Sequence, residues 1–357
     1  MKKWEENIRK VVPYVAGEQP EGENVIKLNT NENPYPPSPW VIEKSRDIDA
    51  AKFPLYPDTE AKALVRELAP YHGISENQIF VGVGSDDVLA MSFLTFFNSK
   101  KPILFPDITY SFYPVWADLY RIPYETIPVN ENFEIIPEDY ERENGGIVIA
   151  NPNAPTSLSL GVSEIEKMIQ ANEDVIVIVD EAYVDFGGTT VLPLLSKYEN
   201  LLVVRTFSKS RSLAGMRIGY AMGSPRLIQA LKDVKESTNS YTMNMESILL
   251  GAESVKDDEY FRTHLDKVVA TREYVKEKLR EMDFEVKDSC TNFLFASHKQ
   301  VPAKHIFEEL RKKNIYVRYF SKPRIDNYLR ITIGTDEQMS CFLTELAKCI
   351  EKSIEKN

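Results

Sequence analysis

Apolar and polar residues follow two different rhythms along the chain, and the change falls near residue 250. Between residues 59 and 250, short apolar runs alternate with segments of helical periodicity, such as 59–72 and 85–97. The run at 175–179 (Val-Ile-Val-Ile-Val) is continuously β-branched, which is typical of a strand buried on both faces of a parallel sheet. Similar runs predict strands at 78–83, 102–105, 124–129, 146–150, 201–205 and 218–222. This alternation predicts a doubly wound α/β sheet.

The two ends of the chain read differently. Residues 1–58 are rich in proline, which fixes φ and restricts the preceding residue, so an extended arm with at most a short N-terminal helix is expected. After residue 250 a long charged helix at 259–282 precedes short strands and helices. We therefore expect an arm (1–45) that joins the small domain and a partner subunit, and a large α/β domain (46–250). Its mostly parallel sheet carries helices on both faces, and a smaller α+β domain (251–357) follows.

Composition narrows the classes of function. A chain of 357 residues exceeds the usual size of one hydrophobic core, so two domains are expected. The formal net charge of −11 gives no attraction to nucleic acid. The three cysteines lack C-x-x-C spacing and the four histidines are scattered, so no metal site is predicted. Charges interrupt the N-terminus and the apolar runs are short, which predicts no signal peptide, no membrane span and a cytoplasmic location.

Polar residues gather where predicted strands end. Gly84-Ser85-Asp86 follows one strand and opens a helix, and a helix N-terminus with glycines suits a phosphate group. A plain strand-to-helix turn capped by Ser85, with no ligand, would give the same sequence pattern. Asp180 and Tyr183 come directly after the buried run at 175–179, where ligands bind in open α/β sheets. A helix-capping aspartate is the simpler alternative.

A lysine follows the next strand. Thr206-Phe207-Ser208-Lys209 lies just past the run at 201–205, and Arg217 follows eight residues later. Lysine attacks carbonyl groups when its site favours the neutral amine, although most lysines are simply solvated. The order of these elements along the chain (glycine turn, the aromatic ring of Tyr110, carboxylate, lysine) favours a reactive lysine over a solvated one. Phosphate cradle, stacking ring, carboxylate and lysine are the parts that pyridoxal phosphate requires.

At this point the sequence resembles the fold-type I pyridoxal-phosphate-dependent aminotransferases over nearly its whole length. Within them it is most similar to the histidinol-phosphate aminotransferases. The resemblance rests on six motifs: residues 28–34 (Leu-Asn-Thr-Asn-Glu-Asn-Pro), 56–58 (Tyr-Pro-Asp), 84–86, 180–183 (Asp-Glu-Ala-Tyr), 206–209 and 329–334 (Leu-Arg-Ile-Thr-Ile-Gly). It implies transamination of L-histidinol phosphate with 2-oxoglutarate, giving imidazole acetol phosphate and glutamate, in histidine biosynthesis. It also implies a homodimer with shared active sites.

The resemblance also implies roles for individual residues. Lys209 would carry the cofactor as a Schiff base and move the proton, Asp180 would pair with the pyridinium nitrogen, and Tyr183 would hydrogen-bond the phenolic oxygen. Tyr110 would stack on the ring, and Tyr56 would reach the cofactor phosphate from the other subunit. The remaining residues around that phosphate would be Gly84, Ser85, Asp86, Thr206, Ser208 and Arg217. Substrate binding would fall to Arg330, with Arg318, Tyr14 and Asn33 as further candidates.

One departure from the family pattern concerns the phenolic oxygen. The family usually reads Asn-Asn-Pro-Thr-Gly, and its second asparagine holds that oxygen. This chain has Ala154 at that position and Ser157 in place of the glycine. Either Asn153 substitutes for the missing amide, or Tyr183 holds the oxygen alone.

Two other functions of the same fold stay open, decarboxylation of threonine phosphate and transamination of an aromatic amino acid. A non-catalytic sensor that binds pyridoxal phosphate would usually carry an added DNA-binding segment, and none is visible in the sequence. A nucleotide-binding enzyme would need a motif such as G-x-G-x-x-G, which the chain lacks.

Overall fold

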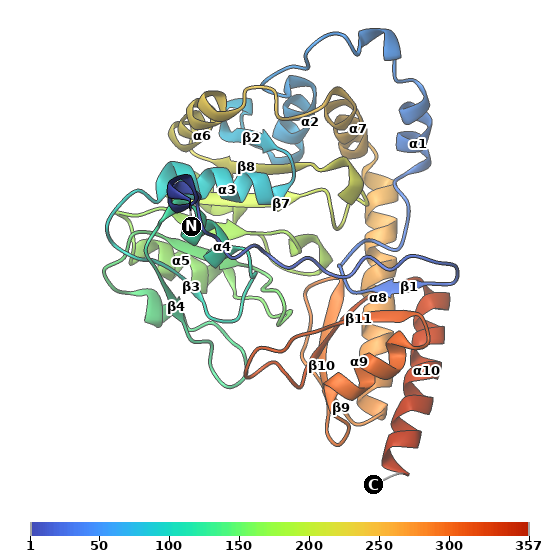
Figure 1. Cartoon of the computed structure of the whole chain (residues 1–357). Helices are drawn as coiled ribbons and strands as arrows, with labels where there is room; N and C mark the ends of the chain where they lie inside the picture. The colour runs from blue at the N-terminus through green and yellow to red at the C-terminus, as the bar shows by residue number, and fades with distance from the viewer. Residues whose placement is uncertain (1, 356–357) are drawn as a thin grey trace.

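The computed structural model describes residues 2–355 and contains two β-sheets (Figure 1). The larger sheet has seven strands in the order β2-β8-β7-β6-β5-β3-β4. Its strands are β2 (Ile79–Gly82), β3 (Ile103–Pro106), β4 (Tyr124–Ile127), β5 (Ile147–Ala150), β6 (Val177–Asp180), β7 (Leu201–Thr206) and β8 (Gly219–Gly223). Strands β3 to β7 pair in parallel, and β8 pairs antiparallel with both β7 and β2. The predicted mostly parallel sheet is confirmed, with β8 as its one reversed strand among the described residues.

Helices cover both faces of this sheet because its strands are apolar on both sides. Alternate residues of β6 enter separate cores: Val177 and Val179 on one face, Ile178 on the other. The first core is covered by α2 (Lys62–His72), α5 (Val162–Gln170) and α7 (Met245–Lys256). The second is covered by α3 (Ser85–Phe96), α4 (Tyr113–Tyr120) and α6 (Pro225–Thr238).

The second sheet has five strands in the order β1-β11-β12-β10-β9. Four of them come from the end of the chain: β9 (Phe284–Val286), β10 (Phe293–His298), β11 (Ile315–Tyr319) and β12 (Leu329–Thr332). They pack with α8 (Asp258–Glu281), α9 (Ala303–Arg311) and α10 (Asp336–Ile354), drawn in orange and red in Figure 1. Strands β2 to β8 thus come before residue 250 and β9 to β12 come after it. We call this second sheet, with its three helices, the small domain.

The proline-rich arm contains two elements that the sequence reading did not expect. Residues Ile26–Leu28 form β1, which pairs in parallel with β11. Residues Pro39–Arg46 form α1, whose first turn is capped by the Ser38 side chain. Proline at the first helical position costs no hydrogen bond and presets φ, so the proline here starts a helix.

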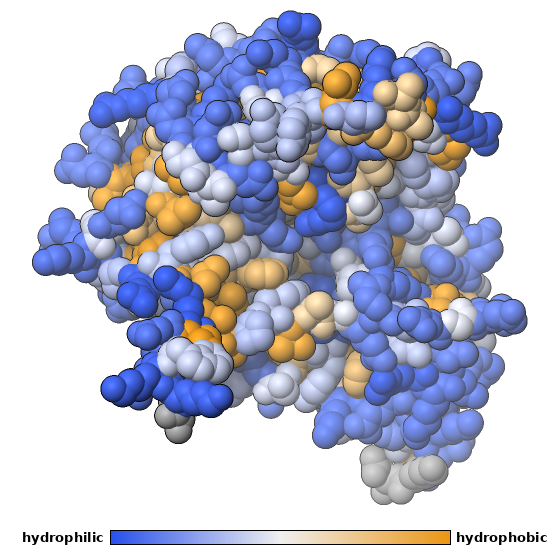
Figure 2. Space-filling view, turned by 45° about the horizontal axis from the view of Figure 1, so that its top comes forward, coloured by the Kyte–Doolittle hydropathy of each residue, from blue (hydrophilic) through white to orange (hydrophobic). Residues whose placement is uncertain are grey.

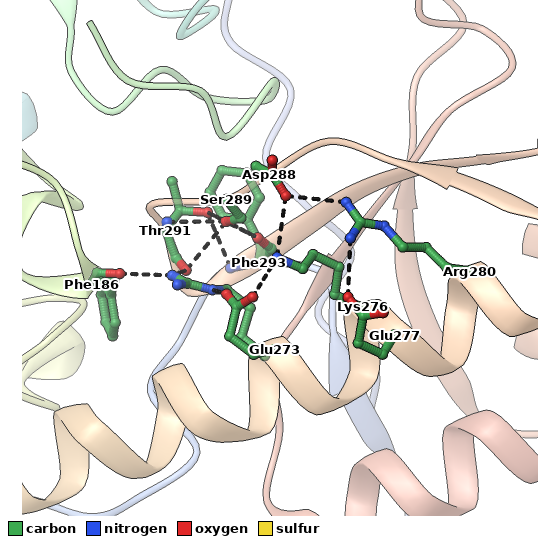
Figure 3. Close-up of polar contacts among 10 residues, drawn as sticks. Phe186, Glu273, Lys276, Glu277, Arg280, Asp288, Ser289, Thr291 and Phe293 are labelled. Atoms are coloured by element: carbon green, nitrogen blue, oxygen red, sulfur yellow. Dashed lines mark hydrogen bonds and ion pairs between the residues drawn. The ribbon is translucent and has the colours of Figure 1, made fainter. Parts of the chain in front are cut away.

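Arg272 of α8 ties the two parts of the molecule together. Its guanidinium is buried and donates to the carbonyl of Phe186, in the turn after β6, at 2.7 Å. It also donates to the carbonyl of Thr291, before β10, at 2.9 Å. Figure 3 shows these bonds beside Asp288, which accepts from Lys276 and Arg280. Because one buried cation serves carbonyls on both sides, the small domain is fixed to the loop that carries Tyr183.

Within residues 2–355, no helix combines the length and apolar character that crossing a bilayer requires.

Candidate active site

Lys209 lies just past the end of β7, beside the end of β6, and points into a cavity of about 180 Å³. Its amino group donates to the carbonyl of Thr30 at 3.3 Å and lies 5.7 Å from the ring centre of Tyr183. The cavity is lined by fifteen residues, which include Thr30, Glu32, Ser85, Asp86, Tyr110, Ala154, Asp180, Tyr183, Ser208, Lys209 and Arg217. The sheet therefore brings together residues that are far apart in sequence.

One end of this cavity is a cluster of hydrogen-bond donors at the start of α3. Gly84 precedes the helix with φ of +84°, and a Cβ there would collide with the guanidinium of Arg217. Arg217 itself lies 3.4 Å from Ser208 Oγ and 3.4 Å from an oxygen of Asp86. Thr206 Oγ1 donates to Ser208 Oγ at 3.0 Å. Helix N–H groups, hydroxyls and a guanidinium together match the oxygens of a phosphate monoester.

Asp180, the last residue of β6, also lines this cavity and is buried. Burial raises the pKa of its carboxyl to about 6, although the hydroxyl of Tyr113 and the backbone N–H of Ala182 donate to it at 3.0 and 3.2 Å. Burial also raises the pKa of Tyr113 well above its usual range, so its hydroxyl stays a donor. No lysine, arginine or histidine within residues 2–355 pairs with Asp180. A carboxylate in this state gains most from a cationic N–H partner supplied by a ligand.

Residues 29–33, the junction segment, connect the lysine to the small domain. Asn31 Nδ2 donates to the hydroxyl of Tyr183 at 2.8 Å. Asn33 Nδ2 donates to the carbonyls of Lys209 and Ser210 at 3.0 and 3.2 Å. Asn33, expected at the substrate, thus holds the backbone of the lysine loop.

Two arginines face each other on neighbouring strands of the small domain. Arg318 of β11 and Arg330 of β12 are register partners, so their side chains share one face. Arg330 donates to the carbonyl of Asn29 at 2.8 Å, while its Nε has no hydrogen-bond partner in the described part of the chain. Burial, and then the charge of Arg318, lower the pKa of Arg330. No carboxylate of residues 2–355 forms an ion pair with either arginine, so the pair is open to an anion.

A second cavity of about 650 Å³ adjoins the first through their shared residue Tyr110. Tyr110 donates to Asp86 at 2.8 Å, and burial raises its pKa well above the usual range. Tyr14 and Arg318 also line this second cavity. Tyr14 stacks on Phe112 at 4.2 Å between ring centres, so the N-terminal arm forms part of the wall of this second cavity.

Two residues predicted to bind the cofactor do not line the cavity of this chain, and one of them, Tyr56, is expected at the site of a partner subunit. Tyr56 is 79% exposed and stacks on Tyr241 at 4.4 Å, outside the cavity. Asn153 does not line the cavity around Lys209, whereas Ala154 does. The amide of Asn153 binds Thr109 at 2.7 Å, the carbonyl of Ile108 at 2.9 Å and Thr156 at 3.0 Å. The amide of Asn153 is thus engaged within the loops, and the side chain that faces the cavity at this place is that of Ala154.

Three residues of the site, Tyr113, Asn31 and Glu32, were not predicted from the sequence. Tyr113 is fully buried, and a buried tyrosine needs a partner for its hydroxyl; Asp180 is that partner. Glu32 lines the cavity; burial raises its pKa, but bonds to Lys27 at 2.5 Å and Thr30 at 2.8 Å leave the pKa lowered overall. Asn31 belongs to a motif used for the resemblance but received no role. Nothing in a single sequence shows which asparagine of that motif faces Tyr183.

These residues fit pyridoxal phosphate at three separate places. The start of α3 offers donors to the phosphate, buried Asp180 lacks a cationic partner among residues 2–355, and Lys209 lines the same cavity. Within residues 2–355, no group of three or more His, Cys, Asp or Glu side chains is arranged to hold a metal ion.

Residues 23–346 match the family model of aminotransferase class I and II. This chain belongs to that family of aminotransferases. The histidinol-phosphate aminotransferase of Clostridium acetobutylicum is 51% identical to it over 347 residues, which cover 97% of this chain and 99% of the relative. The histidinol-phosphate aminotransferase of Lactococcus lactis subsp. lactis is 50% identical over 352 residues, covering 99% and 98%. Within its class, the chain is therefore a member of the histidinol-phosphate aminotransferases.

Solved structures show the same fold. The histidinol-phosphate aminotransferase of Sinorhizobium meliloti, in complex with pyridoxal-5'-phosphate, superposes with a TM-score of 0.85 at 22% identity, covering 92% of this chain and 91% of that one. A decarboxylase from Sulfurospirillum multivorans superposes with a TM-score of 0.75 at 20% identity, covering 92% and 97%. Because an aminotransferase and a decarboxylase share this fold, the fold alone does not distinguish transamination from decarboxylation.

Proposed function

We propose that this protein transfers the amino group of L-histidinol phosphate to 2-oxoglutarate with pyridoxal phosphate as cofactor, giving imidazole acetol phosphate and glutamate in histidine biosynthesis. The observation that carries the proposal is the arginine pair, Arg318 and Arg330, which has no carboxylate partner in residues 2–355. Arginine binds phosphate and carboxylate in the same bidentate geometry. One site can therefore hold the phosphate of one substrate and a carboxylate of the other.

The residues near Lys209 divide the remaining work. When bound, pyridoxal phosphate supplies an electrophilic carbon for the amino group and a ring that withdraws electrons. Lys209 would be the base that carries the proton from the substrate carbon, because an amine can release and take up a proton, whereas the guanidinium of Arg217 in the same cavity stays charged. Asp180, oriented by Tyr113, holds the proton on the ring nitrogen. Gly84, Ser85, Asp86, Thr206, Ser208 and Arg217 would hold the phosphate of the cofactor, and Tyr110 would stack on its ring.

The activity test measures absorbance and product together. Purified protein loaded with pyridoxal phosphate is mixed with histidinol phosphate in a single turnover, and the visible band, carbon dioxide and keto product are followed. We expect the band to shift and keto product to form without carbon dioxide. The variant Lys209→Ala should lose the band and at least about 10⁴-fold in rate, while Lys304→Ala, an exposed lysine of α9, should match the wild type.

Other results would assign the protein differently. Release of carbon dioxide from threonine phosphate would point to the decarboxylase reading, and a shift only with aromatic amino acids to an aromatic aminotransferase. A protein without any visible band after loading would refute the cofactor assignment itself.

The proposal includes a homodimer, acting in the cytoplasm, in which Tyr56 reaches the partner's phosphate site. Apolar side chains stay exposed in this region: Phe53 (56%), Leu55 (65%), Tyr56 (79%), Tyr241 (47%) and Leu249 (44%). Figure 2 shows apolar side chains in several places among hydrophilic ones on the face it draws. Exposed apolar clusters favour burial against another surface.

Complementation between variants tests this arrangement. Lys209→Ala and Tyr56→Ala proteins are unfolded and refolded together, so that mixed dimers form. If Tyr56 acts across the interface, a mixed dimer contains one intact site and activity rises above that of both parents. Activity equal to the average of the parents, or a monomer in sedimentation, would reject the shared site.

A further inference from the structure

The side chain of Asn31 is held in one orientation by the small domain. Asn31 is 1% exposed and has φ of +58°. Its backbone N–H donates to Thr332 Oγ1 at 3.1 Å, and the Thr332 hydroxyl donates back to Asn31 Oδ1 at 2.9 Å. Asn292 Nδ2 donates to its carbonyl at 3.0 Å. With the amide oxygen fixed toward Thr332, the amide nitrogen faces Tyr183 at 2.8 Å.

This orientation sets the direction of the Tyr183 hydroxyl. An amide nitrogen donates and does not accept, so the oxygen of Tyr183 receives the bond from Asn31. The phenolic proton of Tyr183 is then free to donate elsewhere. Tyr183 lines the cavity that holds Lys209. The proton is therefore available to an acceptor inside the cavity.

The cavity lacks the amide that most family members place near the cofactor's phenolic oxygen. Ala154 presents a methyl group there, and the amide of Asn153 is already bound by Thr109, Ile108 and Thr156. Tyr183 is left as the donor to that oxygen, and a lone donor is effective only if its proton points the right way.

We propose that Asn31 is the positioning residue of this site, which fixes Tyr183 as hydrogen-bond donor to the cofactor's phenolic oxygen where Ala154 supplies none. The proposal rests on the proposed function, because it requires bound pyridoxal phosphate. Thr332 lies two residues beyond Arg330 on β12. The strand that carries the anion-binding arginine therefore also orients the donor.

The test is a pH titration of the visible absorbance of cofactor-loaded protein without substrate. A hydrogen bond donated to the phenolic oxygen favours its charged form and lowers the pH midpoint of the spectral change. Tyr183→Phe should raise the midpoint by about 1 unit. Asn31→Gly, which tolerates the positive φ, should raise it by roughly half as much.

A double-variant cycle separates positioning from a structural effect. In the Tyr183→Phe background, Asn31→Gly should cause no further shift, because its effect passes through the missing hydroxyl. Asn31→Asp replaces the donor by an acceptor, draws the phenolic proton out of the cavity, and should raise the midpoint more than Asn31→Gly does. Asn29→Ala is the matched control, because Asn29 is a buried asparagine of the same segment whose amide binds Glu18 instead.

The outcomes are distinct. The inference is overturned if Asn31→Gly titrates like the wild type, or shifts the midpoint equally with and without the Tyr183 hydroxyl. In both cases the wild-type band remains and the proposed function stands. If Asn31→Gly fails to fold, Asn31→Asp decides by the same comparison. A wild-type protein that shows no band refutes the proposed function, and the inference with it.

Discussion

The two sides of the candidate active site differ in how far their polar side chains are already hydrogen-bonded or ion-paired within the protein. On the side of the lysine, polar groups are already paired within the protein: Arg217 with Asp86, Tyr113 with Asp180, and Asn31 with Tyr183. On the side of the small domain, Arg318 and Arg330 oppose each other without a carboxylate from residues 2–355. The first side is organised before its ligand arrives, as suits a cofactor that stays. The second gains its counter-charge only from a passing substrate.

Among changes that leave Lys209 in place, the largest effect should come from the arginine pair, Arg318 and Arg330. Arg330→Met should lower kcat/KM for histidinol phosphate by about 10²–10³-fold, because it removes a charged partner from a buried anion site. The same change should leave the thermal midpoint of unfolding unchanged or raised, since it removes a buried cation that lacks a counter-ion. Steady-state kinetics and calorimetry on the cofactor-loaded protein measure both. A large loss of stability would contradict this prediction, because it would mean that the charge of Arg330 is compensated within the folded protein.

A smaller effect is expected from Asp180, through pH. Burial raises the pKa of this carboxyl from 3.8 to about 6. Between these values the unfolded chain has lost the proton and the folded protein has kept it, so Asp180 makes the cofactor-free protein less stable as pH rises through this window. Asp180→Asn should remove that loss, up to about 3 kcal/mol. Urea unfolding of both proteins at about pH 4 and about pH 7.5 measures the difference; an equal gap at both pH values would contradict it.

The smallest effect concerns the position where this chain departs from its family. Ala154→Asn should return an amide donor to the cavity and lower the pH midpoint of the bound cofactor's absorbance by roughly half a unit. Restoring the amide should also weaken the effect of Asn31→Gly, since Tyr183 would no longer be the lone donor. If the midpoint stays unchanged with the asparagine present, the cavity does not orient an amide toward the cofactor.

The central sheet was predictable because its signals are local. A run such as Val177–Val179 is apolar on both sides, and only a strand between two layers of helices satisfies it. Lys209, Asp180 and Ser85 could be predicted for the same reason, since each directly follows or precedes an element that the pattern marks. Their convergence then follows from the parallel order of the strands.

The missed features depend on contacts across long stretches of sequence. β1 has three residues and exists because β11 offers it an edge, which no local pattern reveals. The hydroxyl of Tyr113 bonds to Asp180, 67 residues away in sequence, and the amide of Asn153 contacts Thr109, 44 residues away. Hydrogen-bond partners of single polar groups are set by the finished structure.

The pairing of β1 with β11 also has a consequence for biogenesis. Ile26 pairs with Ile315, so these partners are separated by 315 − 26 = 289 residues. During synthesis, the strands of the seven-stranded sheet emerge from the ribosome long before β11 does. Contacts between residues so far apart in sequence form late in folding. Thr30, whose carbonyl accepts a hydrogen bond from the amino group of Lys209, lies just beyond β1. The nascent protein would thus hold Lys209 in a folded sheet while its site is still open, and completing synthesis would be the step that closes it.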